Sequence, residues 1–259
     1  AKDLALLFTD IQDFTRLSEN FEPEKIMKYL SEYFQTISKV IIETNGTVDK
    51  YIGDGVMAFW GAPIDDEDHV FHACQAAIKV RVALKQLNRK WQKEGKPSVI
   101  TRFGISSGRV IVGNVGSDDR LNYTSLGDPV NLASRLENLN KSYDTGIMVS
   151  EFVYEKVKNQ FKFKLLDRVA VKGKTQGVYI YELIDEDNLQ FDLDKYNAEF
   201  SHAFSIYESG DWESALKLFK ELSKKHPDDK PIKVLIDRCL YLIKNPPAAW
   251  DGVWVLDEK

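Results

Sequence analysis

The sequence predicts an α+β fold in which helices pack on a sheet, and three observations support this prediction. Periodic segments follow one another in the order strand, helix, hairpin, helix and strand, with shorter pieces of both kinds after them. Apolar residues make up 43% of the 259 residues, which is enough for a large packed core. The charged fraction of 29% is ordinary for a globular protein. One large domain, alone or with a smaller companion, is therefore expected.

The first part of the chain alternates between strand and helix patterns. Residues 4–9 (LALLFT) are a continuous apolar run, typical of a buried strand, and Asp10 ends it. From Pro23 onward apolar residues recur at helical spacing, which predicts a helix. Two strand-like runs meet at a Gly-Asp-Gly sequence, which predicts a hairpin with Asp54 at its tip. A second long helix is expected over residues 68–93.

The middle of the chain returns to short strands and one further helix. Asp128 and Pro129 are expected to open this helix, as N-cap and first helical residue, and it should run to about Leu139. A shorter helix is expected from Glu151. The predicted strands cover residues 100–105, 110–115, 121–124, 147–149, 161–171 and 178–184.

The composition changes from Asp185 onward, where an acidic connection leads into a purely helical pattern. We therefore predict two domains, one over residues 1–187 and a helical one over residues 188–259. The helical segment partly matches the spacing of a tetratricopeptide repeat, through Ala203, Gly210, Trp212, Ala215, Phe219 and Pro227. One such unit cannot bury its own apolar face, so it should dock on the first domain or on a neighbour.

Charge and cysteine content limit the function classes. The net charge is −5, and no continuous basic stripe is present, so a nucleic-acid partner is not expected. Two distant cysteines form no disulfide framework, which favours the reducing cytoplasm. No apolar run reaches the length of a membrane span. The chain starts without Met, which indicates a piece of a longer protein, and an upstream membrane or sensor segment remains open.

Two aspartates are candidates for a metal site. Taken singly, Asp10 is better explained as a turn or cap residue, and Asp54 as ordinary turn chemistry. If residues 4–9 pair beside the hairpin, however, both carboxylates emerge at one edge of the sheet. Such a pair could hold two divalent cations for phosphoryl transfer. Oxygen ligands without a nearby histidine favour Mg²⁺ or Mn²⁺ over Zn²⁺.

Asn131 and Arg135 are four residues apart on the helix predicted after Pro129, so they share one face. This pair is compatible with a solvated helix face. It is also compatible with an amide and a guanidinium that bind phosphate charge.

Four segments, in order, resemble the successive motifs of the class III adenylate/guanylate cyclase catalytic domain, and VKGK resembles its final motif. The family resemblance covers about residues 2–184 and implies a ferredoxin-like core and a head-to-tail homodimer with active sites at the interface. The segments are FTDIQDFT (8–15), KYIGDGVMAF (50–59), RFGISSGRVIVGNVG (102–116), NYTSLGDPVNLASRLE (122–137) and VKGK (171–174).

The resemblance implies roles for individual residues. Asp10 and Asp54 would bind the two metals, with the carbonyl of Ile11. Asn131 would orient the ribose, and Arg135 would stabilise the pentavalent α-phosphate. The remaining implied contacts are with the triphosphate, from Phe14, Thr15, Arg102 and the partner chain's equivalent of Lys172, and with the base, from Lys50 and Thr124.

The residues at the two base-selecting positions favour ATP as substrate. Lys50 can donate to adenine N1, and the Thr124 hydroxyl or the backbone beside it can accept from N6. Family members specific for GTP have Glu and Cys at these places, although Thr124 also departs from the Asp most common in adenylate cyclases. The sequence therefore predicts an adenylate cyclase that uses Mg²⁺ or Mn²⁺. A guanylate cyclase, a nucleotide-binding regulatory domain without turnover, and a scaffold acting through its helices remain as alternatives.

Overall fold

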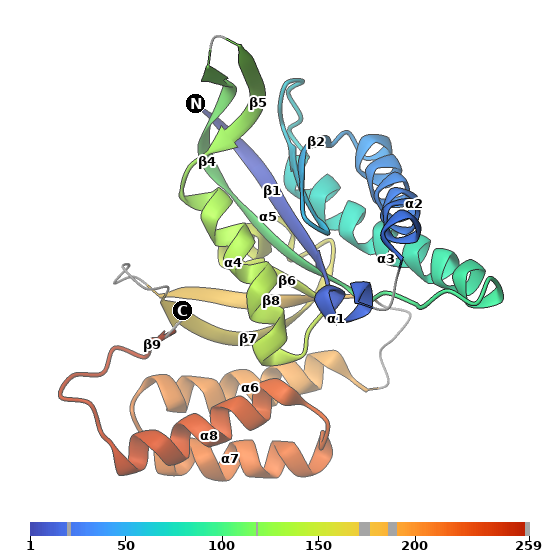
Figure 1. The fold of residues 1–259 in the computed structure, drawn as a ribbon. Helices are drawn as coiled ribbons and strands as arrows, with labels where there is room; N and C mark the ends of the chain where they lie inside the picture. The colour runs from blue at the N-terminus through green and yellow to red at the C-terminus, as the bar shows by residue number, and fades with distance from the viewer. Residues whose placement is uncertain (20–21, 118, 171–176, 186–190, 257–259) are drawn as a thin grey trace. The chain divides into compact units, whose positions relative to one another are not determined.

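The computed structural model describes residues 1–259 except 20–21, 118, 171–176, 186–190 and 257–259 (Figure 1). The chain divides into two compact units. The first unit contains Ala1–Asn140 and Gly146–Gln160, and the second contains Lys141–Thr145 and Phe161–Lys259. The predicted domain boundary between residues 187 and 188 lies outside the described residues.

The sheet of the first unit is centred on β1 (Lys2–Ile11), which pairs antiparallel with β3 (Gly55–Trp60) and with β4 (Thr101–Ser117). β2 (Thr47–Ile52) pairs antiparallel with the other edge of β3, and β6 (Ile147–Ser150) runs parallel to β4. The strand order in this unit is therefore β2-β3-β1-β4-β6. The predicted α+β class is confirmed, and so is the hairpin that carries Asp54.

Among the residues that the structure describes, the first unit also contains four helices besides the one that begins at Asp128. They are α1 (Phe14–Ser18), α2 (Pro23–Glu43), α3 (His69–Lys93) and α5 (Glu151–Val157). α2 and α3 lie side by side in Figure 1, and the rings of Tyr29 and Trp91 stack between them with centroids 4.0 Å apart. The predicted starts of α2 and α5 agree with the structure, and α3 begins one residue later than predicted. The apolar spacing that predicted α2 is its buried face.

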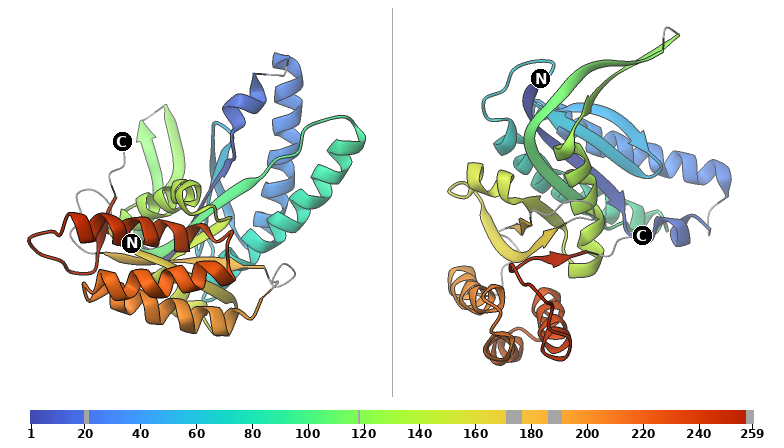
Figure 2. Two further views of the ribbon diagram at one scale, coloured as in Figure 1. Left: turned by 90° about the horizontal axis from the view of Figure 1, so that it is seen from below. Right: turned by 90° about the vertical axis from the view of Figure 1, so that its left-hand side faces the viewer.

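The structure corrects the prediction of two separate strands at residues 100–105 and 110–115, which form the single strand β4. The residues between them, Ser-Ser-Gly-Arg, stay paired with the first half of β1. Because a strand partner satisfies their backbone groups, these small and polar residues do not interrupt the strand. β4 continues into β5 (Arg120–Leu126), and together they form a long hairpin (Figures 1 and 2).

Helix α4 (Asp128–Tyr143) ends four residues later than predicted, and Asp128 is its first helical residue rather than its N-cap. Asn140 and Tyr143, in the added turn, are buried, and the Asn140 side-chain amide donates to the Phe103 carbonyl at 2.9 Å. Tertiary contacts of these residues thus extend the helix past the point where its apolar pattern weakens.

The second unit contains the antiparallel pair β7 (Lys162–Ala170) and β8 (Val178–Ile184), as predicted. A short strand near the end of the chain, β9 (Trp254–Val255), runs parallel to β7. No sequence signal indicated β9, because two residues show no periodicity.

The second unit also contains α6 (Leu193–Glu208), α7 (Trp212–Lys225) and α8 (Lys230–Lys244), which the right-hand view of Figure 2 shows nearly end-on. An aspartate side chain caps the N-terminus of each of these helices. Among the described residues, no helix combines the length and the apolar composition needed to cross a membrane.

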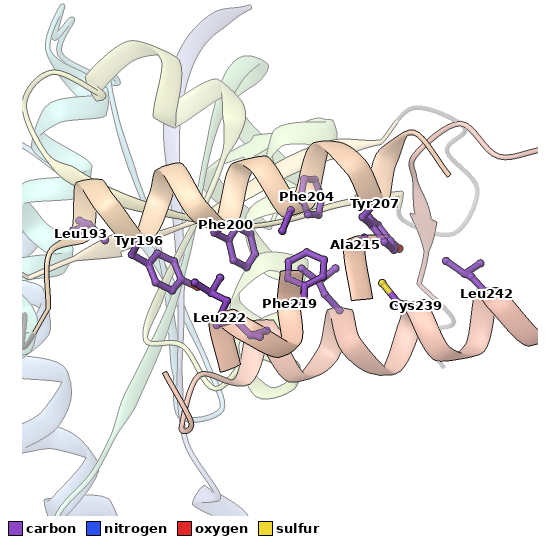
Figure 3. Close-up of a cluster of buried hydrophobic side chains, with 13 residues drawn as sticks. Leu193, Tyr196, Phe200, Phe204, Tyr207, Ala215, Phe219, Leu222, Cys239 and Leu242 are labelled. Carbon is purple, nitrogen blue, oxygen red and sulfur yellow. The ribbon is translucent and has the colours of Figure 1, made fainter. Parts of the chain in front are cut away.

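Aromatic and aliphatic side chains together form the core between these three helices (Figure 3). Leu165 of β7 and Tyr179 and Ile184 of β8 pack against this core, as do Trp250 and Trp254. The expectation that the helical segment docks on residues of the predicted first domain is thereby confirmed for β7 and β8. Its likeness to a tetratricopeptide repeat stays a prediction. The core comprises Leu193, Tyr196, Phe200, Ala203, Phe204, Tyr207, Ala215, Phe219, Leu222, Ile232, Leu235, Cys239 and Leu242.

Two buried ion pairs join the helices of the second unit to β7. Arg238 of α8 pairs with Asp167, whose side chain is fully buried, and the Tyr143 hydroxyl donates to the same carboxylate. Lys164 pairs with Asp229, the residue that caps α8. Each of these buried charges is thus paired with an opposite charge inside the unit.

Candidate active site

The two candidate metal-binding aspartates lie near one end of β1. Asp10 is the penultimate residue of the strand, and Asp54 occupies the turn between β2 and β3. The Asp54 carboxylate accepts a hydrogen bond from the Ile11 backbone N–H at 3.0 Å. The predicted meeting of these residues at one sheet edge is thus found in the structure. We call Asp10, Ile11 and Asp54 the aspartate edge.

Gly55 allows the hairpin to approach β1 this closely. A Cβ atom at position 55 would lie 2.3 Å from the Thr9 carbonyl oxygen, a backbone atom that cannot move aside. The Thr9 hydroxyl also accepts a hydrogen bond from the Val56 N–H at 3.0 Å. The absence of a side chain at position 55 therefore sets the distance between the turn that carries Asp54 and the strand that carries Asp10.

Tyr33 of α2 lies beside the aspartate edge, a placement that the sequence did not indicate. Its hydroxyl is within 3.0 Å of the Thr101 hydroxyl, and the residue is fully buried. Burial raises the pKa of Tyr33 well above its ordinary value, and the negative charges of Asp54 and Asp10 raise it further. Tyr33 therefore stays neutral. In the sequence it was indistinguishable from the other apolar positions of α2.

Arg102 is the direct cross-strand neighbour of Asp10 in the β1–β4 ladder, and it is only 8% exposed. Residues directly opposite in an antiparallel pair share a face, so the guanidinium starts from the same face as the Asp10 carboxylate. Phe14 and Thr15 open α1 just after Asp13, which has a left-handed backbone with φ 55°. Phe14 and Thr15 thus follow β1 directly after a sharp change of chain direction.

Lys50 and Thr124 form a second group. The Lys50 ammonium donates to the Thr124 hydroxyl at 3.2 Å, although the two residues are 74 positions apart. The Thr124 hydroxyl in turn donates to the Asp49 carboxylate at 2.5 Å. The structure therefore brings together the two predicted base-selecting residues, and it adds Asp49, which the sequence did not single out.

Asn131 and Arg135 form the third group, on the predicted common face of α4, with Asn131 exposed and Arg135 partly buried. The helix lies directly on β4 at Gly104, where a Cβ atom would come within 2.1 Å of the Ala133 carbonyl oxygen. Because this contact is between backbones, it fixes the height of α4 above the sheet. Lys172, the other predicted phosphate contact, lies outside the described residues.

The donor atoms of the aspartate edge fit a hard divalent cation. The two carboxylates are held at the same end of β1, and together they raise the pKa of a nearby tyrosine. Oxygen donors of this kind suit Mg²⁺ and Mn²⁺. The candidate site has two carboxylates, and no cluster of three or more His, Cys, Asp or Glu side chains that could hold a metal ion occurs among the described residues.

The chain shares sequence with proteins of known family. Residues 1–184 match the model of the adenylate and guanylate cyclase catalytic domain. Adenylate cyclase 1 of Rhizobium meliloti is 42% identical over 183 residues, which are 71% of this chain and 28% of that protein. The terminal-differentiation-specific adenylate cyclase of Dictyostelium discoideum is 34% identical over 250 residues. That alignment covers 94% of this chain, including the helical segment, and 12% of the relative.

A solved structure agrees with these relationships. The adenylyl cyclase CyaB from P. aeruginosa is 35% identical, with a TM-score of 0.66 over 71% of this chain and 94% of that chain. The chain itself spans only 28% and 12% of the two curated relatives. From the residues 1–184 match and the shared α+β architecture, we conclude that the chain belongs to the class III adenylate and guanylate cyclase family, whose catalytic domain it contains.

Proposed function

We propose that this chain is an adenylate cyclase, which converts ATP into 3′,5′-cyclic AMP and pyrophosphate. One observation carries the proposal: the hydrogen bond from Ile11 to Asp54, which holds two aspartates at one sheet edge, in a domain of the cyclase family. Two divalent cations bound there, Mg²⁺ or Mn²⁺, would lower the pKa of the ribose 3′-hydroxyl and neutralise triphosphate charge. Asp10, Asp54 and the carbonyl of Ile11 would hold them.

Cationic side chains and backbone groups would act on the phosphates. The triphosphate would be bound by the buried Arg102 beside Asp10, by the backbone at Phe14 and Thr15, and by Lys172 of the partner subunit. When the 3′-hydroxyl attacks the α-phosphorus in line, negative charge grows on the α-phosphate oxygens as pyrophosphate leaves. Arg135 would stabilise that charge, and Asn131 would orient the ribose. The backbone contact at Gly104 supports these roles, because it holds α4 rigidly on β4.

The Lys50–Thr124 contact supports ATP as the substrate. An ammonium donates to the acceptor N1 of adenine, whereas guanine presents N1–H at that place, so the two would repel. A guanylate cyclase would require an acceptor at position 50. A regulatory domain without turnover would require loss of a catalytic group, but Asp10, Asp54, Asn131 and Arg135 are all present.

We further propose a homodimer with active sites at the interface between subunits. Exposed apolar side chains on β2, β4 and β5 of the first unit support an interface on that unit. They are Tyr51, Ile52, Ile111, Val115, Leu121, Tyr123 and Leu126. The predicted location is the cytoplasm. The sequence does not decide whether a membrane or sensor segment precedes this chain.

The decisive experiment measures cyclic nucleotide release from ATP and from GTP in the presence of Mn²⁺. Cyclic AMP formation at a higher kcat/KM than cyclic GMP formation is expected. A preference for GTP would replace the proposal by guanylate cyclase. Nucleotide binding without release of any cyclic product would favour the regulatory domain, and neither binding nor turnover would favour a scaffold.

A further inference from the structure

Asp49 occupies an irregular position in the β2–β3 hairpin. Val48 pairs with Ala58 and Lys50 pairs with Met57, so the register shifts and Asp49 is the extra residue of a β-bulge. In a regular strand, adjacent side chains point to opposite faces. Here, however, the Asp49 Oδ1 atom lies 3.2 Å from the Lys50 Nζ atom. The bulge thus brings the carboxylate and the ammonium of adjacent residues together.

The hydroxyl of Thr124 has one proton and two lone pairs. Its proton is donated to the Asp49 Oδ2 atom at 2.5 Å, and one lone pair accepts from Lys50 at 3.2 Å. One lone pair is left for a ligand. With its proton committed to Asp49, the Thr124 hydroxyl can offer a nucleotide base only an acceptor.

The Asp49 side chain has no solvent exposure. Within the described part of the chain, its Oδ1 atom is a buried oxygen that makes no hydrogen bond, although the charge of Lys50 faces it. This oxygen is therefore held by its ion pair with Lys50 rather than by a hydrogen bond. The arrangement explains how Lys50 and Thr124 are kept in fixed positions.

We propose that Asp49 is a positioning residue for substrate choice, which holds the Thr124 hydroxyl as a hydrogen-bond acceptor and thereby favours ATP over GTP. This inference rests on the proposed function. The 6-amino group of adenine is a donor, so it pairs with an acceptor. The O6 atom of guanine is itself an acceptor, so it is rejected by a hydroxyl that has no proton to give. Asp49 does not touch the base and acts through Thr124.

The test compares Asp49→Asn with the unchanged chain, by kcat/KM for ATP, for GTP and for the purine ribonucleoside triphosphate that lacks the 6-amino group. The amide can either donate to or accept from Thr124, so the hydroxyl regains freedom to donate. The ratio of ATP to GTP kcat/KM should fall by about 10-fold to 100-fold, the range for one mismatched buried hydrogen bond. The penalty for removing the 6-amino group should shrink by a similar factor.

Three controls separate a positioning role from a structural one. Asp65→Asn removes the same charge from a side chain that is 89% exposed. The ratio of ATP to GTP kcat/KM should be the same in this variant as in the unchanged chain. In a Thr124→Val background, Asp49→Asn should change the ratio no further, because the hydroxyl through which Asp49 acts is gone. Where Asp49→Asn is poorly folded, Asp49→Ser, which is too short to reach Thr124, should give the same fall in ratio.

If Asp49→Asn lost activity for all three nucleotides in equal proportion, the inference would be overturned. An equal loss indicates a structural defect, whereas a positioning residue must change the choice of substrate. An unchanged penalty for the missing 6-amino group in Asp49→Asn would also overturn it, while the proposed adenylate cyclase stands. If the unchanged chain itself shows no such penalty, the proposed reading of the base by Thr124 is wrong, and this inference is wrong with it.

Discussion

The two units of the chain use charged residues in opposite ways. In the second unit, Asp167 pairs with Arg238 and Lys164 pairs with Asp229, and all four side chains are at most 9% exposed. In the first unit, the predicted catalytic charges on Asp10, Asp54 and Arg135 lie in partly exposed positions. They are held by rigid backbone contacts, such as those at Gly55 and Gly104.

This difference separates structural charges from functional ones. Charges that neutralise each other in a low-dielectric interior are costly to disturb but have nothing left for a ligand. Charges that the backbone holds at an accessible edge can act on a substrate, because a ligand can reach them. We therefore expect substitutions in the first group to change stability, and substitutions in the second to change turnover.

The largest expected effect is on turnover at the aspartate edge. Asp54→Asn should lower kcat by about 10³-fold or more, because a metal-binding carboxylate supports several kcal/mol of transition-state stabilisation. The asparagine oxygen can still accept from Ile11, so the thermal unfolding temperature should stay close to that of the unchanged chain. Full activity of Asp54→Asn at saturating Mn²⁺ would contradict the metal site.

The same variant tests the proposed interfacial sites. Arg135→Ala should also lower kcat by about 10³-fold, by analogy with arginine fingers. In randomly reassociated mixtures of the two variants, half the dimers are mixed and each has one intact site, so about a quarter of the activity should return. If subunits demonstrably exchange and no activity returns, the two residues do not serve sites shared between chains.

The second-largest effect is on stability in the second unit. Asp167→Ala leaves Arg238 buried without its carboxylate, which should destabilise this unit by about 3–5 kcal/mol. The measurement is denaturant unfolding followed by tryptophan fluorescence, since Trp250 and Trp254 pack against the core of this unit. Glu199→Gln, which breaks a more exposed ion pair with Lys225, is the matched control and should be much less destabilising, because solvent screens an exposed pair.

A double variant, Asp167→Leu with Arg238→Met, should recover most of the lost stability, because it removes both charges together. If Asp167→Ala proves no more harmful than the exposed control, the buried pair is not what fastens α8 to β7. The contrast between the two units would then fail on its structural side.

Elements that local sequence signals specify could be predicted, whereas features that depend on contacts between distant residues could not. The Gly-Asp-Gly turn and the apolar run before Asp10 were sufficient to predict the aspartate edge. Asp49 was missed because strict alternation places it on the face opposite Lys50, and a bulge leaves no signal in the sequence. The pairing of Asp167 with Arg238 spans 71 positions, and nothing local to either residue indicates it.

The smallest expected effect concerns a carboxylate of the first unit that forms ion pairs with two lysines. Glu32 of α2 accepts hydrogen bonds from Lys90 and Trp91 of α3 and from Lys96. The hydrogen bonds from Lys90 and Lys96, opposed by partial burial, lower the pKa of Glu32 from 4.5 to about 2. By the distinction between paired and accessible charges, Glu32 should be structural although it lies in the catalytic unit.

Glu32→Gln should therefore lower stability by about 1 kcal/mol at pH 7, because the group lies near the surface where solvent screens the pairs, and should leave kcat/KM for ATP unchanged. A carboxylate with a lowered folded-state pKa stabilises the fold above its unfolded pKa and loses that contribution as the pH falls. The stability difference between the two proteins should accordingly be constant above about pH 4.5 and vanish as the pH falls toward about 2. Urea unfolding across this pH range measures this stability difference.

A difference that grows with acidity would show that the lysines do not stabilise the ionised form. A loss of turnover without a loss of stability would mean that internal pairing does not separate structural charges from functional ones in this unit.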